Sequence, residues 1–241
     1  MTVDVRELRT GVRLADDDTV RMEAVELAPG KAWPLRRHPA SDAVLLFYEG
    51  AGEVRTADRV HAFRSLRHAF VPAGTTYEVR STGDRPLKAI LGLCPFGPTE
   101  VVARPDRRAG PGGVTMLSIE QYDRFPDSGL VRGGMFFLEP GKDAAYHSHD
   151  GAPEVFVFLR GTCDITVEGQ SARAGAGQVV YVPMELKHRL VNPSATEKLY
   201  VWLTVTPNVT PSHTYYEPQA DGTWKRITPR LDGRPSRPPG P

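Results

Sequence analysis

The sequence predicts an all-β chain built from two copies of one β module. Three observations lead to this fold class. Glycine (23) and proline (22) are frequent among the 241 residues, which favours short strands joined by turns. The apolar runs are short and are bounded by turn-forming residues. The chain also matches itself at one constant offset of 111 residues, which indicates an internal duplication.

The offset aligns turn-forming residues with turn-forming residues and apolar residues with apolar ones. The matched pairs are Pro29-Gly30-Lys31 with Pro140-Gly141-Lys142, His38 with His149, Gly50 with Gly161, Pro72 with Pro183, Leu27 with Leu138, and Val71 with Val182. So many matches in one register are hard to obtain by chance. The two copies are therefore expected to share their internal spacing.

The first copy is expected over roughly residues 18–96 and the second over roughly 129–206. Each holds six strand candidates bounded by Gly, Pro, Asp or Ser, as sandwiches and barrels require. Those of the first copy are 21–27, 43–48, 52–56, 69–71, 77–80 and 87–93. Those of the second are 134–138, 154–159, 163–167, 179–182, 188–191 and 198–205.

These copies set the expected domains: a first barrel over 1–97, a linker over 98–118, a second barrel over 119–206 and a tail over 207–241. The linker is assigned because proline, glycine and arginine are dense there. A short helix is expected within 118–125, with Ser118 as its cap and Gln121 three residues later.

The tail is expected to have two parts. Its last ten or so residues (DGRPSRPPGP) have the composition of a disordered segment. The part before them carries Tyr215, Tyr216 and Trp224, which are apolar anchors. We therefore expect this part to lie across the barrel surface or across a partner subunit. His213 lies beyond both barrels and would act as a lid residue, or as a residue behind the ligands, only if the tail folds back.

Composition narrows the class of partner. The 30 basic and 29 acidic residues nearly balance, which gives no reason to expect nucleic acid or an anionic membrane. The first twenty residues are rich in charge and no apolar run is long enough to span a bilayer, so a soluble cytoplasmic protein is expected. Two cysteines, Cys94 and Cys163, are too few for a disulfide scaffold and are expected to be buried free thiols.

A group of potential metal ligands lies in the second copy. His147 and His149 are two residues apart, so a strand would present both imidazoles on one face. Glu154 follows five residues later and His188 lies downstream, five residues after Pro183. Imidazoles with one carboxylate are ligands that a divalent transition metal accepts.

The spacing of these residues resembles a known pair of motifs. Gly141-x5-His147-x-His149-x4-Glu154-x6-Gly161 resembles the first motif of the cupin superfamily, and Gly177-x5-Pro183-x-Glu185-x2-His188-x3-Asn192 resembles the second. Through the repeat, the resemblance implies two tandem cupin barrels (double-stranded β-helix, or jelly-roll) over almost the whole chain. One departure is Glu185, which stands where the family usually has glycine and which could add a carboxylate near the barrel mouth.

The resemblance implies one metal ion per chain, held by His147, His149, Glu154 and His188. An ion that prefers six ligands would keep two positions for substrate or dioxygen. This ligand set suits Fe²⁺ or Mn²⁺ first, and Ni²⁺, Co²⁺, Zn²⁺ and Cu²⁺ remain alternatives.

Residues around the ligands give candidates for the pocket and the chemistry. If Glu154 points into the barrel, strand parity points Phe156 and Phe158 the same way, although both could equally be ordinary core residues. Further wall candidates are Tyr146, Tyr181 and Trp202. Candidate catalytic residues are Glu154, Tyr146 and Glu185, with Lys187 as another proton carrier.

The first copy lacks the ligands. At the offset of 111, the four positions hold Arg36, His38, Ala43 and Tyr77. Asp42 is one residue away from the glutamate position, and that shift on a strand would aim it at the other face. A structural barrel without metal is expected, and a metal-free anion or ligand pocket of Arg36, His38 and Tyr77 is the alternative.

Three functions remain open from the sequence. The first is a metal-dependent dioxygenase acting on a small oxygen-rich substrate such as an organic acid, an enediol or a phenol. The second is a non-redox lyase, isomerase, decarboxylase or aminohydrolase, in which the ion acts as a Lewis acid. The third is a non-enzymatic small-molecule-binding cupin. The dioxygenase is favoured because the predicted pocket has aromatic walls and open metal positions. By analogy with similar barrels, a homodimer is expected.

Overall fold

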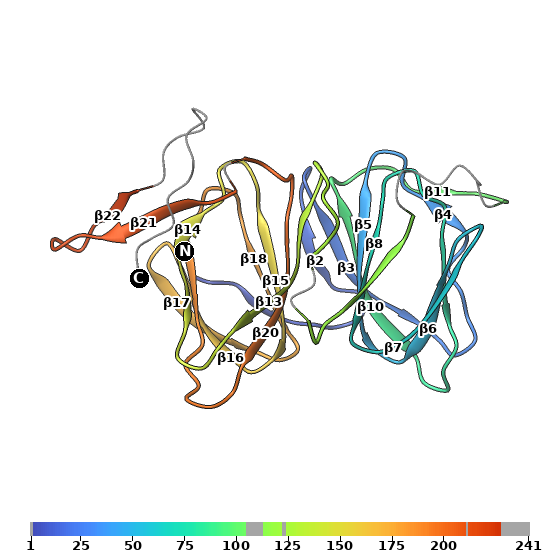
Figure 1. Ribbon diagram of the computed structural model, residues 1–241, viewed down its shortest axis with the longest axis horizontal. Helices are drawn as coiled ribbons and strands as arrows, with labels where there is room; N and C mark the ends of the chain where they lie inside the picture. The colour runs from blue at the N-terminus through green and yellow to red at the C-terminus, as the bar shows by residue number, and fades with distance from the viewer. Residues whose placement is uncertain (1, 105–112, 122–123, 211, 228–241) are drawn as a thin grey trace. The chain divides into compact units, whose positions relative to one another are not determined.

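The computed structural model describes residues 2–104, 113–121, 124–210 and 212–227. Every regular element within these ranges is a β-strand, and neighbouring strands such as Leu87–Cys94 with Arg21–Leu27, and Glu154–Arg160 with Gln178–Val182, pair antiparallel. None of the described residues forms a helix long and apolar enough to cross a membrane. The all-β fold class predicted from the sequence is confirmed (Figure 1).

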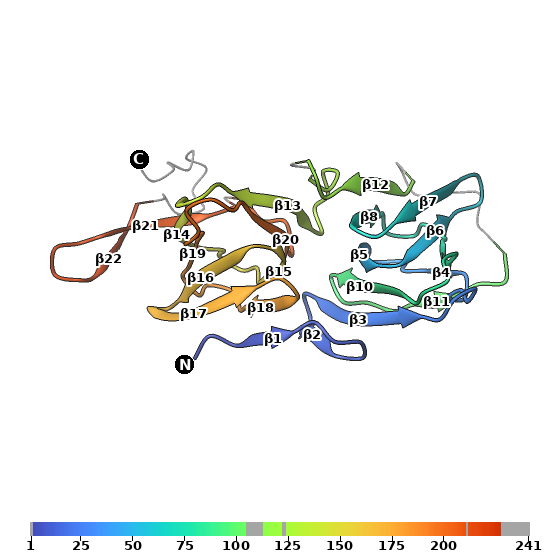
Figure 2. The same ribbon diagram turned by 90° about the horizontal axis from the view of Figure 1, so that it is seen from below.

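The chain divides into two compact units, residues 8–134 and residues 1–7 with 135–241. These bounds differ from the expected domains at both ends. The N-terminal strand β1 (Val5–Glu7) pairs with β18 (Gln178–Val182) of the second unit, as Figure 2 shows. The expected linker also contains two strands, β11 (Glu100–Val101) and β12 (Thr115–Ser118), which pair with strands of the first unit.

The first unit is built from a six-stranded sheet, a three-stranded sheet and a two-stranded ribbon. The six-stranded sheet has the order β12-β8-β5-β10-β3-β2, and the smaller sheets are β7-β6-β9 and β11-β4. The strands not yet given bounds are β2 (Arg13–Asp16), β3 (Arg21–Leu27), β4 (Arg36–Arg37), β5 (Asp42–Glu49), β6 (Ala51–Arg55), β7 (Val60–Arg64), β8 (Arg67–Val71), β9 (Glu78–Ser81) and β10 (Leu87–Cys94).

The second unit consists of two sheets. Their orders are β1-β18-β15-β20-β13 and β17-β16-β19-β14-β21-β22, and the boundary between the units falls inside β13. The strand bounds are β13 (Arg132–Leu138), β14 (Asp143–Ser148), β15 (Glu154–Arg160), β16 (Thr162–Val167), β17 (Gln170–Gly175), β19 (His188–Val191), β20 (Leu199–Val205), β21 (Thr214–Pro218) and β22 (Trp224–Arg226).

The offset of 111 residues reappears in the strand positions. Strand β3 maps onto β13 without a shift, and so does β8 onto β18. The matched glycines Gly50 and Gly161 both have a positive φ, of 89° and 82°. A Cβ atom at Gly50 would lie 2.6 Å from the Pro86 carbonyl oxygen, so the tight turn and the close approach both require glycine.

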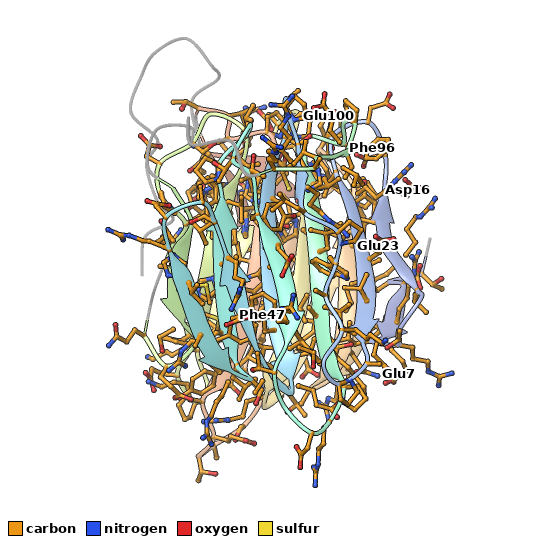
Figure 3. All side chains as sticks on the ribbon, turned by 90° about the vertical axis from the view of Figure 1, so that its right-hand side faces the viewer. Glu7, Asp16, Glu23, Phe47, Phe96 and Glu100 are labelled. Carbon is orange, nitrogen blue, oxygen red and sulfur yellow. The ribbon has the colours of Figure 1, made fainter. Side chains whose placement is uncertain are left out.

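Each unit encloses its own apolar core. Alternate residues of β5 (Ala43, Leu45 and Phe47) belong to the core cluster of the first unit, and Figure 3 shows Phe47 among its strands. In the second unit Phe156 and Phe158 of β15 take this place, with Val180 and Val182 of β18. Both faces of β5 and β15 are buried over most of their length, which explains why these strands read as continuous apolar runs in the sequence.

The structure also bears on the predictions for the two cysteines, for the short helix and for the end of the tail. Cys94 and Cys163 are buried free thiols, as expected, and burial raises the pKa of Cys163 to about 12. The expected helix within 118–125 is wrong for its described part, where β12 ends at Ser118 and residues 119–121 form a turn. Residues 122–123 lie outside the described residues, and so do the last fourteen, on which the expected disorder falls.

Candidate metal centre

The four predicted ligands converge in the second unit. One nitrogen or oxygen atom from each of His147, His149, Glu154 and His188 lies within 4.8 Å of the others, and all four residues are buried. Within the described part of the chain, no other group of His, Cys, Asp or Glu side chains forms such a cluster.

Strand pairing brings these residues together. His147 on β14 is the direct partner of His188 on β19, and their ring centroids lie 4.3 Å apart. Directly paired residues of an antiparallel ladder project to the same face, so both imidazoles point the same way. His149 follows the end of β14, and its carbonyl accepts a hydrogen bond from the Glu185 amide at 3.0 Å.

The glutamate comes from the neighbouring sheet. Glu154 is the first residue of β15, and it pairs with Val182 at the end of β18. Its Oε2 atom lies 2.8 Å from His149 Nε2 and 2.9 Å from His188 Nε2. The ends of the two sheets thus meet at one carboxylate oxygen.

The outer nitrogen of each imidazole faces a backbone carbonyl oxygen. The Nδ1 atoms of His147, His149 and His188 lie 2.6, 2.5 and 2.9 Å from the carbonyl oxygens of Ala145, Ser212 and Leu186. A carbonyl oxygen can only accept, so each Nδ1 carries the proton and donates it. In the neutral ring, Nε2 is then left with a free lone pair, which is the state of a metal ligand.

Burial favours the neutral form of His147, and the neighbouring histidines favour the ionised form of Glu154. Burial lowers the pKa of His147 well below its ordinary value, and charge on His188 and His149 lowers it further. For Glu154, burial alone would raise the pKa, but His149 and His188 outweigh this and hold it well below its ordinary value. At neutral pH the neutral form of His147 and the ionised form of Glu154 are therefore favoured.

This donor set fits a divalent metal ion. The Nε2 atoms of His149 and His188 lie 2.8 and 2.9 Å from one carboxylate oxygen of Glu154. Because both neutral rings carry their proton on Nδ1, these two nitrogens can only accept a hydrogen bond, and the carboxylate oxygen can only accept as well. Such a contact between acceptors needs positive charge, and one divalent ion among the four atoms would satisfy all of them. The residues would hold it with three nitrogens and one oxygen.

The predicted pocket residues fall into two groups. Phe156 lies in the interior cluster with its ring 5.7 Å from that of His188, and the Phe158 ring lies 6.5 Å from that of Phe156. Tyr181 pairs with Val155 and Trp202 pairs with Val157, residues that alternate with Glu154 and Phe156 along β15. Strand parity therefore puts Tyr181 and Trp202 on the opposite face of the sheet, against their predicted place in the pocket wall.

The side chains of two predicted catalytic residues also lie outside the ligand cluster. Tyr146 alternates with His147 along β14, and its ring packs 4.2 Å from that of Trp224. Glu185 is exposed in the turn before β19, outside the group of converging atoms. It has a φ of +66°, a left-handed conformation that favours glycine, so a glutamate stands where the backbone suits glycine. Lys187 pairs with Glu168 at 3.0 Å.

His213, which the sequence connects to the site only if the tail folds back, lies beside the ligands. Its ring centroid is 4.9 Å from that of His147 and 4.8 Å from that of His149. The tail reaches the site because β21 pairs with β14, with Tyr215 opposite His147. The aromatic anchors of the tail were the one signal in the sequence that pointed to this contact.

The equivalent position in the first unit holds no ligand cluster among the described residues. His38 Nε2 lies 2.9 Å from the Tyr77 hydroxyl, and its Nδ1 lies 3.0 Å from Thr99 Oγ1. Arg36 pairs through its backbone with Tyr77, as His147 does with His188. Asp42 accepts hydrogen bonds from the Ala73 amide and the Ser128 hydroxyl. The loss of the ligands that the repeat predicts is therefore visible in the structure.

Comparison with known proteins agrees with this geometry. Residues 134–204 match the family model described as "Cupin domain". A mannose-1-phosphate guanylyltransferase of Sinorhizobium fredii is 33% identical over 82 residues, which are 34% of this chain. The chain spans only 14% of the length of that curated relative.

Solved structures of two enzymes share the fold over most of the chain. Salicylate 1,2-dioxygenase of Pseudaminobacter salicylatoxidans is 15% identical, with a TM-score of 0.66 over 78% of this chain and 71% of that one. A mutant oxalate decarboxylase of Bacillus subtilis is 13% identical, with a TM-score of 0.60 over 89% and 80% of the two chains. Residues 134–204 therefore form a cupin domain, the chain shares the two-barrel fold of these bicupin structures, and one candidate metal centre lies in its C-terminal half.

Proposed function

We propose that this protein is a metal-dependent bicupin enzyme, and that it is a dioxygenase of a small oxygen-rich organic substrate. The observation that carries the proposal is the orientation of the ligands. Three buried histidines each donate through Nδ1 to a carbonyl, and the Nε2 atoms of His149 and His188 lie within 2.9 Å of one carboxylate oxygen of Glu154. Holding three imidazoles in this way serves a metal site and has no evident use in an ordinary core.

The chain contributes ligand orientation, charge and exclusion of water. A divalent ion bound here would supply open coordination positions for substrate oxygens, and redox chemistry if it were iron. Glu154 supplies one negative charge, which would leave the occupied centre with a net positive charge and favour an anionic substrate. Phe156 and Phe158, buried on the same strand face as Glu154, keep water from one side of the centre.

The choice of a dioxygenase is supported by the kind of enzyme that shares the fold. The salicylate 1,2-dioxygenase has also been solved in adducts with gentisate, which like salicylate is an aromatic hydroxy acid. A carboxylate next to a hydroxyl can bind a metal ion through two oxygens. Aromatic hydroxy acids are therefore the first substrates to try, followed by other small organic acids and enediols.

Oxygen consumption tests the proposal directly. The purified chain would be loaded with Fe²⁺ and given salicylate, gentisate and related acids in an oxygen electrode. The proposal expects oxygen uptake in step with substrate loss, and no substrate loss under anaerobic conditions. Turnover without oxygen would contradict the dioxygenase.

A non-redox decarboxylase is the second candidate. The oxalate decarboxylase matches a larger share of this chain, 89% against 78% for the dioxygenase. Such a reaction needs a side chain that moves a proton. Tyr146 is a candidate for this role from the sequence, but it lies on the opposite strand face from the ligands, which counts against it. Release of carbon dioxide from oxalate or related acids by Mn²⁺-loaded protein, without net oxygen consumption, would favour this candidate.

A further inference from the structure

The segment that follows the last barrel strand returns to the metal centre. Strand β20 ends at Val205, and residues 212–218, here called the C-terminal strap, lie along β14 through the pairing of β21 (Figure 1). We propose that the C-terminal strap is a positioning element of the metal centre, which fixes the orientation of His149 and His147 from outside the ligand set. This inference rests on the metal function proposed above.

The hydrogen bond to His149 differs from those to the other two histidines. His147 and His188 each use the carbonyl two residues before them, in Ala145 and Leu186. His149 uses the carbonyl of Ser212, which is 63 residues away in the sequence. The local chain therefore orients two ligands, whereas the orientation of the third depends on the strap. Without the Ser212 carbonyl, the ring of His149 would lose the hydrogen bond that fixes its Nδ1 proton and restrains its orientation.

His213 adds contact with the same ligands. Its ring meets that of His149 edge-on, with the centroids 4.8 Å apart, and that of His147 at 4.9 Å. It is held in turn by the parallel ring of Tyr215 at 5.4 Å, and its Nδ1 lies 2.7 Å from the Ser212 hydroxyl. A ring packed on two ligand imidazoles restricts their rotation.

The strap has anchors of its own that involve no metal ligand side chain. The Ser148 and Tyr216 hydroxyls lie 3.1 Å apart, next to the backbone pairing of Ser148 with Thr214. Arg226 on β22 donates to Asp150 at 2.7 Å and to Thr214 at 3.2 Å. The position of the strap is therefore set by the protein, as a positioning element requires.

A pair of truncations tests the proposal. Ending the chain after Asn208 removes the strap, and ending it after Ile227 keeps the strap, its hairpin partner β22 and the amide of Ile227 that bonds Tyr215. Metal-free protein would be titrated with Co²⁺, followed by the visible absorption of the bound ion. The shorter chain should bind Co²⁺ about 10- to 100-fold more weakly than the full chain, as expected when an outer hydrogen bond to a ligand is lost. The longer one should match the full chain.

The possible outcomes separate this proposal from the metal function. Equal affinity of the shorter and the full chain would overturn the positioning role and leave the metal centre standing. A full chain that binds no Co²⁺ would refute the metal centre itself. Circular dichroism at the same temperature would show whether the shorter chain is folded.

Point variants keep the proposal testable if the shorter chain does not fold. His213→Ala should weaken Co²⁺ binding, and His213→Phe should restore most of it, because the phenyl ring keeps the packing but cannot bind metal. Arg226→Gln should weaken binding about threefold by loosening an anchor. Its control is Arg173→Gln, which breaks the exposed ion pair with Asp164 on the same barrel and should change nothing. Unchanged binding in both His213→Ala and Arg226→Gln would overturn the proposal, as would His213→Phe binding no better than His213→Ala.

Discussion

At the scale of single residues, the partner of the Nε2 atom of one equivalent histidine distinguishes the two barrels. Both His149 and its repeat counterpart His38 are buried, and each receives a partner at Nδ1 from a later segment of the chain. The Nε2 of His149 faces Glu154, whereas that of His38 faces the hydroxyl of Tyr77. A hydroxyl can donate to a neutral imidazole, so His38 needs no metal.

Alanine substitutions should therefore separate the two histidines. His147→Ala, His149→Ala or His188→Ala removes one of four ligands, and the purified protein is expected to lose its metal. His38→Ala leaves all four ligands in place, so metal content should stay at the value of the unmodified chain. Atomic absorption on each dialysed variant checks this. Loss of metal in His38→Ala would contradict the division of roles between the barrels.

His38 should also affect stability in acid. Burial and, second, the charge of Arg36 lower the pKa of His38 to about 4, from 6.5. As the pH falls from about 6.5 to 4, the unfolded chain binds a proton that the folded chain does not, so stability falls over this window, by about 3 kcal/mol at most. Denaturant unfolding at pH 7 and pH 4.5 should show a smaller acid loss for His38→Gln than for the unmodified chain. An equal loss would refute the assignment.

The turn before β19 stores strain at Glu185. A residue with a side chain at a φ of +66° is disfavoured, and glycine is not. Glu185→Gly should raise the free energy of unfolding by roughly 0.5–1 kcal/mol, after the entropy gained by the unfolded chain is subtracted. Glu185→Ala keeps a Cβ atom and is the control that should show no such gain. Equal stability of the two variants in urea unfolding would contradict the strain.

At the scale of elements, strands from outside the repeat complete the second barrel. Strand β1 pairs with β18 over Val5↔Val180 to Glu7↔Gln178, and Val3 and Val5 pack against the interior cluster. Strand β21 extends the other sheet at β14. Both additions lie next to strands that carry or adjoin metal ligands. The second barrel therefore depends on both ends of the chain.

Deletion of residues 2–7 should destabilise the second unit alone. The loss of the pairing and of the Val3 and Val5 contacts should lower its free energy of unfolding by about 1–3 kcal/mol. Hydrogen exchange should become faster at the amides of β18, while those of β8, the matching strand of the first unit, should keep their protection. Equal acceleration in β8 and β18 would contradict the assignment of β1 to the second unit.

At the scale of the whole molecule, the sequence predicts most of the structure that the two repeated modules share. It predicts little of the structure formed by segments outside the repeat. The offset of 111 residues carries the strand pattern, and the family motif carries the four ligands, because both depend on local spacing. Strand β1 and the C-terminal strap pair with strands far away in the sequence, and no spacing records such contacts. Tyr181 and Trp202 were predicted as wall residues from their type, whereas the register of β15 decides which face they occupy.

The central claim is that one barrel of the two holds a metal ion. Both barrels keep the fold, but the four ligand positions of the first hold Arg36, His38, Ala43 and Tyr77. Metal analysis of the purified chain by mass spectrometry, against protein concentration from amino-acid analysis, tests this most directly. We expect about one equivalent of a divalent transition metal per chain. A value near two, or a value near zero after incubation with excess Fe²⁺ or Mn²⁺, would contradict the claim.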